Sequence, residues 1–183
     1  MKKHLVIGSL GIAVVTAIGA TLVSAGDWAE RLGRGRPGIA PVADAKYRAL
    51  CGECHMAYQP GLLPAASWQR VMDGLGDHFG DDAQLAPADA EAIRDYLAAN
   101  AADRAASRRS RGFSRVGAPG DAPLRITETR YFLGKHDEVP ERLVRDNAEV
   151  RSLANCPACH QQADAGSYNE DDVRIPGVGR WDD

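Results

Sequence analysis

The sequence predicts a mainly α-helical protein with two small units, and two observations support this. Apolar residues recur at helical spacing in Trp68, Val71, Met72, Leu75 and Phe79, and a second amphipathic helix is predicted over 88–99. Only 124–129 alternates enough to predict a strand, and that segment is brief. The second observation is a short cysteine motif that occurs once in each half of the chain, which suggests two units of similar chemistry.

The first 25 residues predict export. Lys2 and Lys3 precede an apolar run, and small residues lead up to Ala25, as in a cleaved signal peptide. The apolar run is long for a signal peptide, so an uncleaved membrane anchor is the alternative. We therefore expect a signal peptide over 1–25 and a periplasmic mature chain. A net charge of −3 gives no indication of a nucleic-acid partner or an anionic membrane surface.

The two copies of the motif account for all four cysteines. Cys51 and Cys54 precede His55, and Cys156 and Cys159 precede His160, so both copies read C-x-x-C-H. This spacing is typical of covalent haem attachment. Each thiol adds to one vinyl group of the haem, and the histidine that follows provides an axial ligand to the iron.

Four cysteines in two C-x-x-C pairs also have two other common uses. An exported protein can pair them in two disulfides, and two C-x-x-C pairs can hold a structural zinc ion. Neither use requires a histidine directly after both pairs. The repeated histidine therefore favours two covalently bound haem c groups.

The order of predicted elements defines the domains. Residues 44–50 predict a short helix that leads into the first motif, and Ser67 is the predicted N-cap of the next helix. This order is typical of a class I cytochrome c domain. Helices are also predicted over 130–136 and 141–153, in a half too irregular for the same fold. The expected division is an irregular lead-in (26–43), a cytochrome c-like domain (44–103), an Arg-rich linker (104–123) and a second haem-binding domain (124–183).

The number of histidines suggests the remaining iron ligands. Of five histidines, His4 leaves with the signal peptide, and His55 and His160 follow the cysteines. His78 and His136 remain for the two open axial positions, which predicts two histidine ligands per iron. Proximity in the sequence pairs His78 with the first haem and His136 with the second, although crossed ligation between domains is possible.

Methionine is the competing ligand. Met56 directly follows His55 and cannot reach the opposite face of the same haem. Met72 lies in the apolar stripe and is interpreted as a core residue. The second half contains no methionine, so its haem either uses His136 or has an open position.

Four segments resemble the bacterial diheme cytochrome c family. They are 55–64, 77–80, 123–129 and 169–176, and the resemblance extends over most of the chain beyond the signal peptide. The family is found alongside a small oxygen-binding monohaem cytochrome, the sphaeroides haem protein. The resemblance implies a class I domain, a C-terminal domain with little regular structure and two low-potential haems. It implies axial ligation by His55, His78, His136 and His160, with electron delivery to the monohaem partner from a donor such as a membrane cytochrome b.

An electron carrier, and not an enzyme, is the predicted function. With both axial positions of both irons filled by the protein, no small-molecule substrate can bind the metal, and only its oxidation state changes. A diheme peroxidase needs a vacant or displaceable position, and the chain is short for that class. A haem-based sensor would need a signalling domain, for which the sequence shows no segment.

Overall fold

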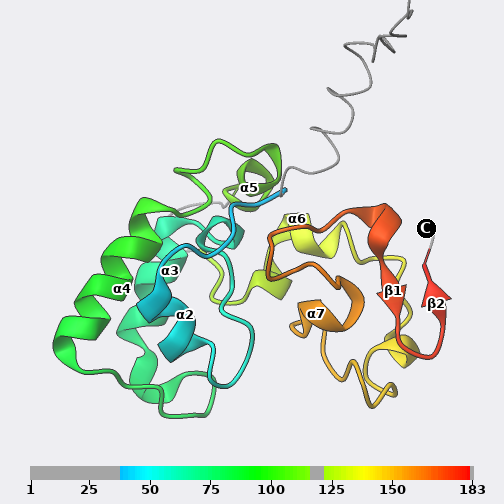
Figure 1. Cartoon of the computed structure of the whole chain (residues 1–183), viewed down its shortest axis with the longest axis horizontal. Coiled ribbons are helices and arrows are strands. Elements are labelled where there is room, and N and C mark those ends of the chain that lie inside the picture. Colours follow the sequence, from blue (N-terminus) through cyan, green and yellow to red (C-terminus); the bar gives the residue numbers. More distant parts are fainter. Residues whose placement is uncertain (1–37, 116–121, 182–183) are drawn as a thin grey trace, which may run out of the picture. The chain divides into compact units, whose positions relative to one another are not determined.

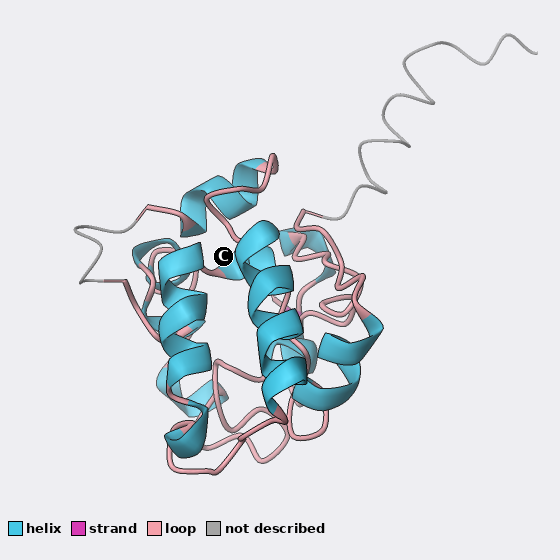
Figure 2. Ribbon diagram, turned by 90° about the vertical axis from the view of Figure 1, so that its left-hand side faces the viewer, coloured by secondary structure: helices cyan, strands magenta, loops and turns pink. Residues whose placement is uncertain are grey.

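Helices and irregular loops make up most of the described residues, 38–115 and 122–181 of this computed structural model (Figures 1 and 2). The mainly α fold is confirmed. The predicted signal peptide, most of the predicted lead-in and the last two residues lie outside this described part. Within it, no helix is long and apolar enough to cross a membrane.

Three helices build the first half around one apolar core. The carboxylate of Asp44 accepts a hydrogen bond from the backbone N–H of Tyr47 and so begins α2 (Ala45–Cys51), as expected for an N-cap. α3 (Ala65–Asp73) packs against α4 (Pro87–Ala99), and Pro87 stands in the first turn of α4. The core comprises Val42, Tyr47, Leu63, Trp68, Met72, Ile93, Leu97 and Ala101. The helices predicted over 44–50 and 88–99 are confirmed.

α3 differs from the prediction at both ends. It begins after Pro64, so Ser67 is a buried residue inside the helix and not its N-cap. It ends at Asp73, and Leu75–Asp77 forms a 3₁₀ turn, η2. The predicted stripe is therefore wrong at its end, because Phe79 is 45% exposed. Gly74, which caps α3, and Gly76 both weaken continued helix formation.

The described part of the Arg-rich segment contains a short helix. Ser107 caps a short helix, α5 (Arg108–Phe113), by accepting a hydrogen bond from the backbone N–H of Ser110. Ser110 and Phe113 are buried, and the ring of Phe113 meets the ring of Tyr131 edge-on at 4.8 Å. The apolar Phe113 thus anchors α5. Residues 116–121 lie outside the described part.

The second half has little regular structure. Its elements are η4 (Ile126–Glu128), α6 (Arg130–Leu133), η5 (Glu141–Leu143), α7 (Cys156–Cys159), η6 (Glu170–Asp172) and the antiparallel strands β1 (Arg174–Ile175) and β2 (Gly179–Arg180). The strand predicted over 124–129 is wrong, since a 3₁₀ turn stands there. The hydroxyl of Thr129 donates to the carbonyl of Ile126 and caps α6, which favours that turn.

The helix predicted over 141–153 is also wrong beyond η5. The side chain of Asn147 donates a hydrogen bond to the carbonyl of Pro176, and Arg151 has a positive φ of 62°. The positive φ is not compatible with a continuous helix through Arg151, and the bond from Asn147 fixes the loop to the turn after β1. The helix predicted over 130–136 is confirmed only for α6, after which the chain turns before His136.

A second apolar core draws on both ends of the described chain. It comprises Ile39, Leu62, Ala102, Phe113, Phe132, Ala163 and Tyr168. The backbone N–H of Ile39 donates to the carbonyl of Gly166 at 3.1 Å. The lead-in is thus irregular at its described end but not peripheral, because Ile39 is fully buried.

Candidate functional site: two clusters of cysteine and histidine

The first cluster forms where α2 ends. Cys51 is the last residue of the helix, and the turn after it carries Cys54 and His55. The Nδ1 atom of His55 lies 2.7 Å from the carbonyl of Met56, and the His55 ring stacks on Tyr58 with centres 4.8 Å apart. An Nδ1–H bonded to a carbonyl fixes the tautomer and leaves Nε2 for a metal ion.

A tight turn brings His78 to this cluster. Its backbone N–H donates to the carbonyl of Asp81 at 2.7 Å, and the two residues between them, Phe79 and Gly80, have φ values of 59° and 106°. Positive φ at both central positions is the type I′ pattern. A non-glycine residue in this region is strained, which is common at functional sites. The guanidinium of Arg125 lies 3.9 Å from the centre of the Phe79 ring and stabilises the turn.

The second cluster surrounds α7. Cys156 and Cys159 are the first and last residues of this helix, and His160 follows as its C-cap. The backbone N–H of His160 donates to the carbonyl of Cys156 at 2.8 Å, and His160 forms an isolated bridge with Val173. The motif is thereby held between the loop before it and the segment that enters β1.

His136 faces this cluster from the turn after α6. Its Nδ1 atom lies 2.9 Å from the carbonyl of Phe132, and its ring stacks on the Phe132 ring with centres 3.9 Å apart and planes at 11°. Since Phe132 is buried, this stack fixes the direction of the imidazole. The carbonyl contact again directs Nε2 away from the backbone.

The four histidines come together in two direct pairs. The ring centres of His55 and His78 are 6.3 Å apart with planes at 26°, and those of His136 and His160 are 6.2 Å apart with planes at 77°. Two imidazoles on opposite faces of one iron have ring centres about 6.2 Å apart, because each metal–nitrogen bond is about 2 Å and each nitrogen lies about 1.1 Å from its ring centre. Both separations fit one iron between the rings.

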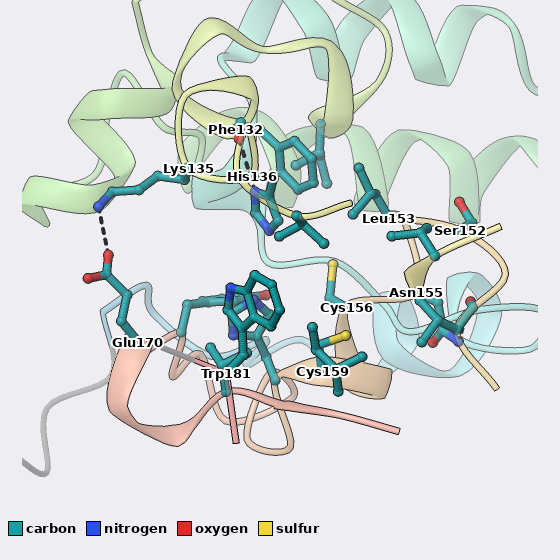
Figure 3. Close-up of a pocket in the computed structure, with 18 of the residues that line it drawn as sticks. Phe132, Lys135, His136, Ser152, Leu153, Asn155, Cys156, Cys159, Glu170 and Trp181 are labelled. Atoms are coloured by element: carbon teal, nitrogen blue, oxygen red, sulfur yellow. Dashed lines mark hydrogen bonds and ion pairs between the residues drawn. The ribbon is translucent and has the colours of Figure 1, made fainter. Parts of the chain in front are cut away.

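The second cluster lines a mainly apolar cavity (Figure 3). Cys156, Cys159, His136 and His160 all face it. Its apolar walls comprise Leu62, Phe113, Ile126, Phe132, Val139, Leu143, Val144, Val150, Leu153, Val173 and Ile175. Both thiols of the second motif therefore line the same cavity as the imidazoles of His136 and His160, as haem binding requires.

The electrostatics of the second cluster favour uncharged ligand groups. Burial, with the nearby charges of His136 and Arg109, lowers the pKa of His160 to about 4. Burial also raises the pKa of the Cys156 thiol to about 11. In the first cluster, burial and the neighbouring His55 lower the pKa of His78. A neutral imidazole is the form that binds a metal ion.

The alternatives weighed from the sequence are not supported. The four cysteines form no disulfide, and in residues 38–115 and 122–181 no three His, Cys, Asp or Glu side chains are grouped to hold a metal ion. Met72 lies in the first core and is 6% exposed, whereas the ring of His78 faces His55.

Two residues that the sequence did not single out connect the halves. The hydroxyl of Tyr58 donates to the carbonyl of Ala154 at 2.8 Å, close to the second motif. Gln59 is fully buried, and its amide donates to the carbonyl of Ala163 at 2.6 Å and accepts from the Tyr168 hydroxyl at 2.6 Å. A single polar residue with no periodicity around it carries no sequence signal for such a role, so only the structure finds it.

The comparisons with known proteins agree with this geometry. A model of the family described as dihaem cytochrome c matches residues 47–168. The diheme cytochrome c of Shewanella baltica OS155 is 42% identical, and the alignment covers 75% of this chain and 97% of that one with a TM-score of 0.62. The diheme cytochrome c of Rhodobacter sphaeroides is 43% identical, and the alignment covers 70% of this chain and 99% of that one with a TM-score of 0.62. No curated protein sequence matches the chain.

The family match extends over both cysteine motifs and both histidine pairs. The two solved relatives are similar over nearly their whole length, so the likeness is not confined to the C-x-x-C-H signal. The chain belongs to the dihaem cytochrome c family, and it is a haem electron-transfer protein with two covalently bound haem c groups.

Proposed function

We propose that this chain is a periplasmic single-electron carrier in which each haem iron is bound by two histidines. His55 and His78 bind the first iron, and His136 and His160 bind the second. The observation that carries the proposal is the separation of the two ring pairs, 6.3 Å and 6.2 Å, which suits one iron between each pair.

Two ligand histidines per iron determine the chemistry. Oxygen or peroxide needs a free axial position, and a histidine on each face fills both. The protein around each haem then changes little when the iron changes its oxidation state, because packed and hydrogen-bonded side chains hold the ligands. A carrier, and not a diheme peroxidase, is the function that this arrangement supports best.

Low reduction potentials follow from the same ligands. A thioether ligand raises the potential of a haem, whereas a second imidazole stabilises ferric iron. We expect both haems to titrate well below His/Met cytochromes c in a spectroelectrochemical titration. Met72→Leu is the matched control, because it removes the methionine of the first core with little change in volume, and it should leave both midpoints unchanged. A high midpoint that falls in Met72→Leu would instead identify methionine as a ligand.

The proposed acceptor is a small monohaem cytochrome, and the proposed donor is a membrane cytochrome b. Electron-transfer encounters are small, weak and steered by charge. The chain offers two charged surfaces. One is on α5, where Arg108 and Arg111 are exposed, and the other is on η6, where Asp171 has a side chain that is 79% exposed, next to the exposed Asp172.

We expect the second-order rate of electron transfer to such an acceptor to fall steeply as salt rises. Stopped-flow absorbance of the two cytochromes measures this rate. Arg108→Gln with Arg111→Gln neutralises one surface, and Asp171→Asn with Asp172→Asn neutralises the other. The double substitution at the docking surface should flatten the salt dependence of the rate, whereas the other double substitution should leave it steep. A rate that is indifferent to salt in the unaltered protein would contradict electrostatic steering.

A further inference from the structure

The charged groups of the second cavity, which define its polar side, gather away from its cysteines. In the view of Figure 3, the Lys135–Glu170 ion pair lies at one side and the two cysteines at the other, with Trp181 between them. Lys135 and Glu170 are 2.6 Å apart, so each is already paired. Arg109 lines the same cavity from α5. The cavity therefore has one covalent side and one polar side.

Covalent attachment determines which part of the haem reaches the polar side. The vinyl groups that become thioethers occupy one half of the porphyrin, and the two propionates occupy the opposite half. Bonds to Cys156 and Cys159 would thus direct the propionates away from α7 and toward the polar side. Carboxylates in a partly buried place need hydrogen-bond donors or positive charge.

Trp181 has a buried donor that no partner satisfies. Its indole Nε1 atom is buried and makes no hydrogen bond within the described residues. Leaving such a group unpaired costs about 1–3 kcal/mol. The residue lines the second cavity, and its backbone N–H is bonded to the carbonyl of Val173 at 3.3 Å, which holds it beside the segment that contacts His160. A haem carboxylate would satisfy this indole N–H.

Arg109 supplies a positive charge at the same side. It is half-buried and forms no ion pair or hydrogen bond with other described residues, whereas its neighbour Arg108 is exposed. A hydrogen bond from Lys135 is the main cause that lowers the pKa of Glu170, and the charge of Arg109 adds to it. α5 is held in place by the buried Ser110 and by the contact of Phe113 with Tyr131.

We propose that Arg109 and Trp181 together bind the propionates of the second haem, Arg109 by its guanidinium charge and Trp181 by its indole N–H. A guanidinium suits a carboxylate because its planar donors match the two oxygens. Arg109 also opposes the propionate charge that stabilises ferric iron. It therefore raises the reduction potential of the second haem relative to a site without it.

An EPR-monitored redox titration tests the proposal, because it can follow the two ferric haems separately. We expect Arg109→Gln to lower the equilibrium constant for reduction of the second haem about tenfold, which corresponds to a midpoint about 59 mV lower. The midpoint of the first haem should stay unchanged. Trp181→Phe keeps an aromatic ring and removes the N–H. We expect it to lower the same equilibrium constant about threefold. Arg108→Gln is the matched control, with the same loss of charge at an exposed neighbour.

The outcomes separate this inference from the proposed ligation. Equal shifts in Arg109→Gln and Arg108→Gln, or no shift in Trp181→Phe, would overturn the propionate contact. Arg109→Lys keeps the charge, so a midpoint close to that of the unaltered protein supports the contact, and a shift as large as that of Arg109→Gln contradicts it. Failure of the bis-histidine ligation shows differently, as a high-spin signal or a midpoint in the range of His/Met cytochromes c in the unaltered protein. Haem content by pyridine haemochrome confirms that each variant carries both haems.

Discussion

Replacing His136 with alanine is expected to remove one of two distinct low-spin EPR signals, and His78→Ala the other. Imidazole planes set the shape of each signal, because parallel rings split the iron d orbitals strongly and perpendicular rings leave them nearly degenerate. The planes at 26° in the first pair predict a rhombic signal, and those at 77° in the second predict a strongly axial one. Each variant should also gain a high-spin signal and bind carbon monoxide at one haem.

The two variants are controls for each other. His136→Ala should remove the axial signal and leave the rhombic one, and His78→Ala should do the reverse, because the His78 ring is paired with His55 and the His136 ring with His160. Carbon monoxide binding by the reduced protein, measured by absorbance, counts the opened positions. If either variant keeps both irons low-spin and does not bind carbon monoxide, the replaced histidine is a core residue and the ligand assignment is wrong.

Gln59→Leu is expected to lower the free energy of unfolding by about 3 kcal/mol, because it leaves two buried polar groups unpaired. The side chain is fully buried and bonds both the carbonyl of Ala163 and the hydroxyl of Tyr168. Leucine is similar in size, so the change removes hydrogen bonds and opens little space. Denaturant unfolding, followed by tryptophan fluorescence and haem absorbance, measures the loss.

Gln69→Leu is the matched control for this change. Gln69 lies on α3 and is exposed, and its side chain makes no hydrogen bond with other described residues. Surface substitutions of this kind alter stability by less than about 0.5 kcal/mol. Equal stability of Gln59→Leu and the unaltered protein would show that water satisfies the two groups as well as the amide does.

The sequence predicted the chemistry of the site better than its architecture. The two C-x-x-C-H motifs and the count of histidines identified the side chains that the structure gathers, because attachment needs close spacing and leaves few candidates. The helices over 44–50 and 88–99 were predicted from apolar residues on one helical face, and the structure has them at 45–51 and 87–99. Phe79 was placed on a helix because its spacing fits one, although a strained turn at 79–80 decides its position.

The irregular half was predicted least well, for a physical reason. Its segments pack around the second cavity and are held by bonds between distant residues, such as that from Asn147 to Pro176. Periodicity reports only on neighbours within one element, so it cannot detect such bonds. The donor of Trp181 and the inward place of Arg109 were likewise absent from the sequence pattern, since both depend on which segments meet.

The burial of Ile39 has a consequence for the order in which the chain assembles. Synthesis proceeds from the N-terminus, and early segments fold when their contacts are complete. Ile39 precedes the first cysteine motif, yet its backbone N–H bonds to Gly166, and its side chain packs with Ala163 and Tyr168. In an exported chain, as proposed above, Ile39 can therefore be buried only after the segment up to Tyr168 has also crossed the membrane. The second core thus depends on residues that are far apart in the order of synthesis.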